Sequence, residues 1–178
     1  MGNWNMQTAL AVELPELDPV LDKHRKRLDP ARGRGMMAHV TVLYPFIDTE
    51  DLTDAAIDAI AMIAARTRAF DTSFTEVRWF GEDIAWLAPS PAGPFVALTT
   101  EVVERFPLHQ PYDGAFGDIV PHATIGHRGT PTDLDTAVHQ IERGLPIPAS
   151  ARDLSLLARE PLTDQWRPLR RCALGDAP

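Results

Sequence analysis

The chain lacks the features that several large classes of protein require. It contains one cysteine, Cys172, which excludes an intramolecular disulfide framework and a cysteine cluster for structural zinc, and favours a reducing compartment. No run approaches the roughly eighteen apolar residues that a transmembrane helix needs, and the first residues hold no basic segment leading into a long apolar stretch. We therefore expect a soluble, cytoplasmic protein without a membrane partner.

Positive charge is also scarce, since 17 Lys and Arg residues stand against 25 Asp and Glu residues and give a net charge of −8. Binding along a nucleic acid regardless of its sequence needs an excess of basic side chains. The charge balance therefore argues against a broad surface for a long nucleic acid. The length of 178 residues suits one domain, and 44% hydrophobic residues are enough to form its core.

The sequence has no glycine-rich phosphate loop after its first predicted strand, which argues against a doubly wound nucleotide-binding fold. Strand and helix patterns alternate, and they predict an α+β fold with mostly antiparallel sheets around a central cleft and helices on the outer faces. Strands are predicted at 4–14, 38–43, 70–80, 84–87, 119–125, 151–159 and 166–174, and helices at 18–28, 52–67, 95–106 and 133–144. Pro30 is expected to end the first helix and to be followed by a loop at 32–35.

Two short segments share one pattern: a histidine, a small apolar residue, a threonine and a β-branched apolar residue. They are residues 39–42 (HVTV) and 122–125 (HATI). Side chains alternate between the two faces of a β-strand, so each segment would present its His and Thr together and bury its apolar pair. Two such strands side by side would bring two imidazoles and two hydroxyls into one cleft: His39, Thr41, His122 and Thr124.

This set of side chains can break a phosphodiester without a metal. The ordinary pKa of imidazole lies near neutrality, so one ring can accept a proton while the other donates one, and the hydroxyls can hold an anion. The alternative is that the two matches arose by chance, since a chain with six histidines is expected to contain about half of one His-x-Thr match. Strands also favour threonine where no ligand binds. Both segments lie in apolar runs beside a proline, Pro45 or Pro121, which favours a shared role.

Metal ligation is another alternative for these histidines. The sequence contains no HExxH motif, and neither segment has an Asp/His pair at ligand spacing or a cysteine partner. We therefore predict a site with no metal and no cofactor.

The longer strings 39–46 (HVTVLYPF) and 121–127 (PHATIGH) resemble the two signature motifs of the 2H phosphoesterase superfamily, in the branch labelled the 2′-5′ RNA ligase family. The resemblance covers most of the chain and implies one bilobal domain over residues 1–178, with a motif in each pseudo-symmetric lobe. It implies a metal-independent phosphodiesterase for a 2′,3′-cyclic nucleotide or an RNA terminus, with 2′-5′ ligation as the reverse reaction. One histidine would deprotonate water and the other would protonate the departing ribose oxygen, while Thr41 and Thr124 would bind the phosphoryl oxygens.

Three further residues are candidates for substrate contact. The rings of Tyr44 and Trp86 could each stack on a base or pack in the core. His127 stands where several members of the superfamily have an arginine, and by strict alternation it points away from His122 unless the strand bends at Gly126. Two other functions remain open: a nucleotide-binding sensor domain with little turnover, and a phosphodiesterase for a non-RNA cyclic phosphate such as an ADP-ribose derivative. We expect a monomer whose partner is a small nucleotide or an RNA terminus.

Overall fold

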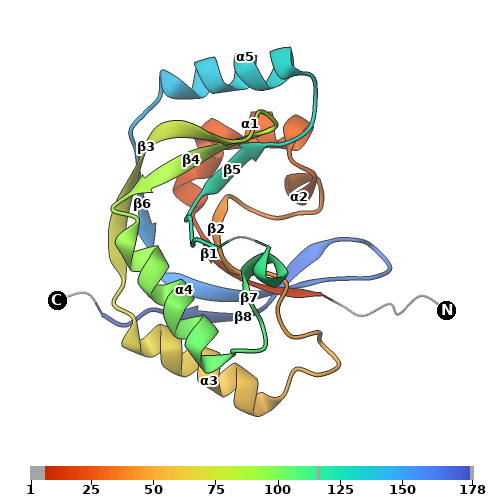
Figure 1. Ribbon diagram of the computed structural model, residues 1–178, viewed down its shortest axis with the longest axis vertical. Coiled ribbons are helices and arrows are strands. Elements are labelled where there is room, and N and C mark those ends of the chain that lie inside the picture. The colour runs from red at the N-terminus through yellow and green to blue at the C-terminus, as the bar shows by residue number, and fades with distance from the viewer. Residues whose placement is uncertain (1–6, 116, 177–178) are drawn as a thin grey trace.

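Two four-stranded sheets form the centre of the computed structural model, which describes residues 7–115 and 117–176 (Figure 1). Every pairing within them is antiparallel. The first sheet has the order β2 (His39–Leu43), β1 (Thr8–Glu13), β7 (Asp153–Arg159), β8 (Trp166–Ala173). The second has the order β5 (Ala123–Gly126), β4 (Ile84–Ser90), β3 (Phe70–Phe80), β6 (Ile147–Ala151). The predicted α+β class with antiparallel sheets is confirmed.

Helices connect and cover these sheets. In Figure 1, α5 lies beyond one end of the second sheet, and α3 and α4 lie at the opposite end of the molecule. The longer helices are α1 (Asp18–Leu28), α3 (Asp54–Arg66), α4 (Gly93–Arg105) and α5 (Pro131–Glu142), and the short ones are α2 (Pro30–Gly33), η1 (Pro15–Leu17) and η2 (Pro111–Gly114). Within the described ranges, none of the helices combines the length and apolarity needed to cross a bilayer.

The core joins the two sheets. One cluster of buried apolar side chains includes Val12 and Leu156 from the first sheet, Phe74 and Leu87 from the second, and Phe95 from α4. These side chains pack because each strand and helix has an apolar face that must be covered. The opposite faces of β2 and β5 remain available for other roles.

Two short elements were not predicted, each for a local reason. Residues 30–33 form the short helix α2, which replaces the first half of the loop predicted at 32–35. Pro30 suits the first turn of a helix, and the Asp29 carboxylate accepts a hydrogen bond from the Ala31 N–H at 2.9 Å. Helix α1 does end before Pro30, since Asp29 is extended, as a residue preceding proline usually is. Strand β6 was not predicted, because it contains Pro148 and small residues, and its place at a sheet edge tolerates both.

Other strands are shorter than predicted. β1 begins at Thr8, and the first residues of the predicted strand 4–14 lie partly outside the described residues. β5 begins at Ala123 rather than at 119, because the preceding residues include Pro121 and have no strand pairing on β4 before Ala123. The predicted hairpin of 70–80 and 84–87 is confirmed as β3 and β4.

Candidate active site

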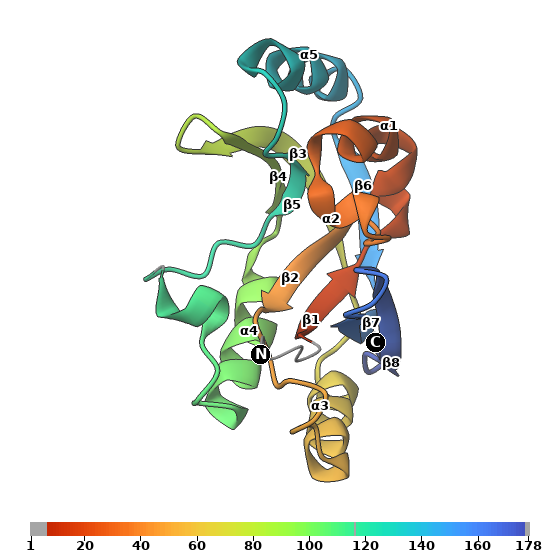
Figure 2. The same ribbon diagram turned by 90° about the vertical axis from the view of Figure 1, so that its right-hand side faces the viewer.

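The two His-x-Thr segments lie on edge strands of different sheets, and β2 and β5 contact each other in the middle of the molecule (Figure 2). β2 begins with His39, and β5 begins directly after His122. Both histidines and both threonines are partly exposed. The apolar residues that alternate with them are buried as predicted: Val40, Val42, Ala123 and Ile125. Each strand therefore turns its His and Thr away from the core.

The two imidazoles are held in the same way. Nδ1 of His39 lies 2.7 Å from the carbonyl oxygen of Met37, and Nδ1 of His122 lies 2.8 Å from that of Val120. A carbonyl oxygen only accepts, so each Nδ1 carries a proton and donates it. In each neutral ring Nε2 is then the nitrogen with a free lone pair, which can accept a proton and later return it.

The surroundings of both rings favour the neutral form. Burial lowers the pKa of His39 to about 4, and the positive charges of Arg25 and of protonated His122 act in the same direction. Burial also lowers the pKa of His122, against the opposing effect of its hydrogen bond to the Val120 carbonyl. A positive charge on His122 thus disfavours a second positive charge on His39.

Tyr112 joins the site from the loop that precedes the second motif, and the sequence analysis did not identify it. Its phenol hydrogen-bonds to the Thr41 side chain, and burial raises the pKa of the phenol. Its backbone N–H donates to the Tyr44 carbonyl oxygen at 2.6 Å. The only local sign of this role is an aromatic residue in a loop rich in Pro and Gly, which is too common to indicate a site.

Aromatic rings form a wall beside His122. Phe80 and Trp86 stack with ring centroids 4.7 Å apart, and both meet His122 edge-on, at 5.0 and 5.8 Å. Trp86 is only 4% exposed, so the half-buried Phe80 is the ring of the pair that reaches the surface. Phe80 was not among the predicted site residues, because strands favour aromatic residues for packing alone.

Tyr44 and His127 lie near the motifs but are engaged with protein groups. The Tyr44 hydroxyl donates to the Gln7 side chain at 2.8 Å, and its ring meets Trp166 edge-on at 6.0 Å. The imidazole of His127 is 41% exposed, with Nε2 3.8 Å from Oδ1 of Asp29. The roles of both residues in substrate binding stay predictions.

The strand carrying the second motif is bent before His127. The β4–β5 register shifts between Trp86 and Ala85, whose partners are Thr124 and Gly126. Gly126 packs so closely on α1 that an added Cβ would lie 2.5 Å from the Leu28 Cβ. The His127 N–H then donates to the Leu28 carbonyl oxygen at 2.9 Å, which places this histidine at the end of α1.

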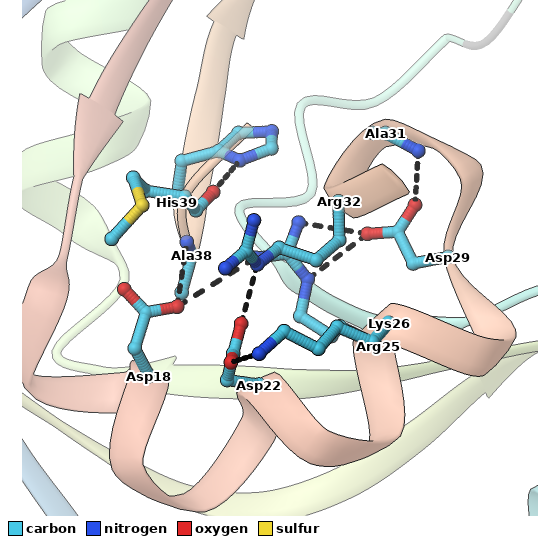
Figure 3. Close-up of polar contacts among 10 residues, drawn as sticks. Asp18, Asp22, Arg25, Lys26, Asp29, Ala31, Arg32, Ala38 and His39 are labelled. Carbon is cyan, nitrogen blue, oxygen red and sulfur yellow. Dashed lines mark hydrogen bonds and ion pairs between the residues drawn. The ribbon is translucent and has the colours of Figure 1, made fainter. Parts of the chain in front are cut away.

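A buried charged cluster lies behind His39 (Figure 3). Arg25 has a side chain only 1% exposed, and its Nε and Nη2 donate to Oδ2 of Asp29 at 3.0 and 2.8 Å. Oδ1 of Asp18 accepts the Ala38 N–H at 3.2 Å and lies 4.0 Å from Nη1 of Arg25. The cluster thus ties α1 to the residue before His39. Sequence placed Arg25 in a helix, but a single arginine there gave no sign of burial.

Among residues 7–115 and 117–176, no group of three or more His, Cys, Asp or Glu side chains is arranged to hold a metal ion. What the described site can do chemically is proton transfer at two imidazoles beside hydroxyl donors. This chemistry suits the opening or closing of a phosphate ester.

Comparison with known proteins places the chain in a family. Residues 13–161 match the family model of the 2′-5′ RNA ligase superfamily. Similar solved structures include LigT of E. coli complexed with NADP+, at 16% identity with a TM-score of 0.58 over 96% of this chain and 98% of that one. LigT of E. coli complexed with 3′-AMP is 18% identical, with a TM-score of 0.57 over 96% of this chain and 98% of that one.

A third similar structure is TT0787 of Thermus thermophilus, at 16% identity with a TM-score of 0.59 over 97% of this chain and all (100%) of that one. A search of the curated proteins found no match. The structural likenesses show a shared fold, and the family match extends over both His-x-Thr segments. The chain belongs to the 2′-5′ RNA ligase superfamily, as the two motifs predicted.

Proposed function

We propose that the protein is a metal-independent phosphodiesterase that opens the 2′,3′-cyclic phosphate of a nucleotide or an RNA end. Membership of the superfamily supports a phosphoesterase-type activity. The observation that carries the finer proposal is the matched pair of imidazoles, each with Nδ1 donating to a backbone carbonyl and Nε2 left for proton transfer. Binding alone would not need two groups arranged in this way.

His39 is the base and His122 the acid in this proposal. The cation Arg25 acts on His39 in addition to burial, so His39 is the ring more strongly kept neutral. Its Nε2 takes a proton from water as the water oxygen bonds to phosphorus. His122 acts in its protonated form, with a proton on Nε2 as well as on Nδ1. The bond from phosphorus to one ribose oxygen breaks, and the Nε2 proton passes to that oxygen. Thr41 and Thr124 donate to the nonbridging oxygens, where negative charge increases in the transition state.

The nucleoside part of the substrate belongs beside the wall of aromatic rings next to His122. Trp86 supports the half-buried Phe80 there, and Tyr44 and His127 are the further candidates for contact with the nucleotide. We propose, with this activity, one domain over residues 1–178 that acts as a monomer in the cytoplasm on a small nucleotide or an RNA end.

Hydrolysis of a panel of 2′,3′-cyclic nucleotides in excess EDTA tests the activity. We expect turnover to be the same with and without EDTA, because proton transfer and phosphate binding are assigned to side chains, and to yield one monophosphate isomer. Separation of the 2′ and 3′ products by chromatography provides the readout. Activity that EDTA abolishes and a divalent metal restores would contradict the proposal. Nucleotide binding without any turnover would favour a sensor domain instead.

The pH dependence of kcat/KM should follow the two histidines. A base works above its pKa and an acid below its own, so the rate should rise as pH increases through the value of about 4 for His39. It should fall again as pH increases through the pKa of His122, which burial holds below the ordinary 6.5. Initial rates at subsaturating substrate across this range measure both limbs. An alkaline limb centred above 6.5 would contradict the assignment of His122.

A further inference from the structure

Tyr112 has a backbone conformation that a tyrosine seldom adopts. Its φ is 52° and its ψ 40°, and Asp113 after it has φ 54° and ψ 29°. Both residues are therefore in the left-handed region, where a side chain with a Cβ is strained and glycine is favoured. Two consecutive strained residues persist only where surrounding contacts hold them, and such strain is often found at functional sites.

Two hydrogen bonds of Tyr112 connect this turn to the first motif segment. The Tyr112 N–H donates to the Tyr44 carbonyl oxygen, directly beyond the end of β2, at 2.6 Å. Its phenol hydrogen-bonds to Thr41 within β2. Neighbouring side chains in the same loop are exposed, Leu108 to 93%. The strained turn therefore places one hydroxyl against the threonine proposed to bind phosphate, while most of the loop stays at the surface.

The direction of this hydrogen bond decides what Thr41 can do. A threonine hydroxyl has one proton to donate and two lone pairs with which to accept. If Thr41 donated to the phenol, it would have no proton left for a phosphoryl oxygen. Burial, the larger effect, raises the pKa of Tyr112 above its ordinary 10.0, and the hydrogen bond to Thr41 lowers it to a smaller extent. The phenol therefore stays protonated and is able to donate.

We infer that Tyr112 is a positioning residue for the phosphate site: its hydroxyl donates to the Thr41 oxygen, and the Thr41 proton is thereby directed at a nonbridging phosphoryl oxygen. This inference rests on the proposed function, since it assigns phosphate binding to Thr41. It also gives the strained turn a role, because a relaxed loop would not carry the phenol to β2. The second motif threonine, Thr124, pairs in register with Trp86 and supplies a matched comparison.

Tyr112→Phe removes the hydroxyl and keeps the ring, so it is the variant to test. We expect kcat with a 2′,3′-cyclic nucleotide to fall about tenfold with a smaller change in KM, because the Thr41 hydrogen bond strengthens in the transition state. The dissociation constant for inorganic phosphate, measured by titration calorimetry, should rise about threefold. Thr100→Val is the control, since Thr100 lies on α4 with its hydroxyl bonded to the Val96 carbonyl oxygen, and it should change neither value.

A double-mutant cycle separates positioning from general support of the loop. Tyr112→Phe should cause no further loss in a Thr41→Val background, because the hydroxyl that it orients is already absent. Tyr112→Phe should lower kcat by the full amount, about tenfold, in a Thr124→Val background. The same loss is expected in a Thr41→Ser background, where a hydroxyl remains at position 41. A merely structural role would lower activity equally in all of these backgrounds, and that result would overturn the inference.

The phosphate measurement also distinguishes this inference from the proposed activity. If the wild type lacks turnover but phosphate binding follows the expected pattern across the cycle, the proposed hydrolysis fails and the role of Tyr112 is supported. If the wild type hydrolyses the cyclic nucleotide and Tyr112→Phe matches it in both measurements, the inference is overturned while the activity holds. Failure of the wild type to bind phosphate overturns the inference in either case.

Discussion

Replacement of His39 by alanine should lower kcat/KM for cyclic-phosphate hydrolysis by about 10² to 10⁴, and His122→Ala should do the same. Each change removes one of the two proton-transfer groups, and neither ring can take over the work of the other within a single turnover. The two side chains act as a unit, so the double variant should be little worse than the poorer single variant. Steady-state kinetics on a 2′,3′-cyclic nucleotide measures these losses.

His139→Ala is the matched control for these variants. His139 lies on α5 with its Nδ1 2.8 Å from the Asp135 carbonyl oxygen, an arrangement that resembles the motif histidines, but it is exposed on the helix and belongs to neither motif. We expect its loss to leave kcat/KM unchanged. A large loss in only one of the two motif variants would contradict the paired mechanism. Retained phosphate binding in both would show that the losses belong to the chemical step.

Replacement of Arg25 by methionine should lower the free energy of unfolding by about 3 to 5 kcal/mol. Arg25 and Asp29 are an almost fully buried ion pair, with side chains 1% and 2% exposed, and Asp18 lies beside them. Removing the guanidinium leaves one or two carboxylates buried without a cation, and this desolvation is the main cost. Equilibrium unfolding in urea, followed by circular dichroism, measures the change.

Lys26→Met provides a control on the next residue of the same helix. Lys26 is 61% exposed and pairs with Asp22 at 2.7 Å, so water screens the pair and its loss should cost less than about 1 kcal/mol. If Arg25→Met and Lys26→Met lowered the free energy of unfolding equally, the larger contribution assigned to the buried Arg25–Asp29 pair would be contradicted. The double variant Arg25→Met with Asp29→Leu should recover part of the loss, because both buried charges are then absent.

The same Arg25 variant tests how His39 is tuned. The guanidinium lowers the pKa of His39, and Asp29 acts against it, so removing the cation should raise that pKa from about 4. The acidic limb of kcat/KM should then move to higher pH, and NMR titration of the His39 ring should show the same shift. An unchanged titration in a folded variant would mean that burial alone, the largest cause, sets the value.

Local patterns were sufficient for much of this fold. Apolar periodicity predicted the long helices α1, α3, α4 and α5, and alternation predicted that Val40, Val42, Ala123 and Ile125 would be buried. The patterns failed for segments whose local conformational preference differs from the structure that they adopt at their place in the fold. Strand β6 has weak strand propensity and forms because it pairs with β3 at a sheet edge. The short helix α2 depends on the Asp29 side chain, which the sequence could not place.

The amino-acid sequence by itself determined which side chains could do chemistry and which face of each strand would carry them. Side-chain alternation is a property of the extended backbone, so His39 and Thr41 had to share a face wherever the strand lay. The same residues form the two strings that resemble the family motifs, and the family match covers both strings.

Tertiary structure alone decided which groups meet. The edges of two sheets bring β2 to β5, a strained turn brings Tyr112 to Thr41, and the end of α1 brings Arg25 behind His39. These partners are far apart along the chain, and their approach depends on packing of the common core rather than on local preference. Burial and neighbouring charge set the pKa of each imidazole, so the chemistry of the two histidines was decided only when the chain folded.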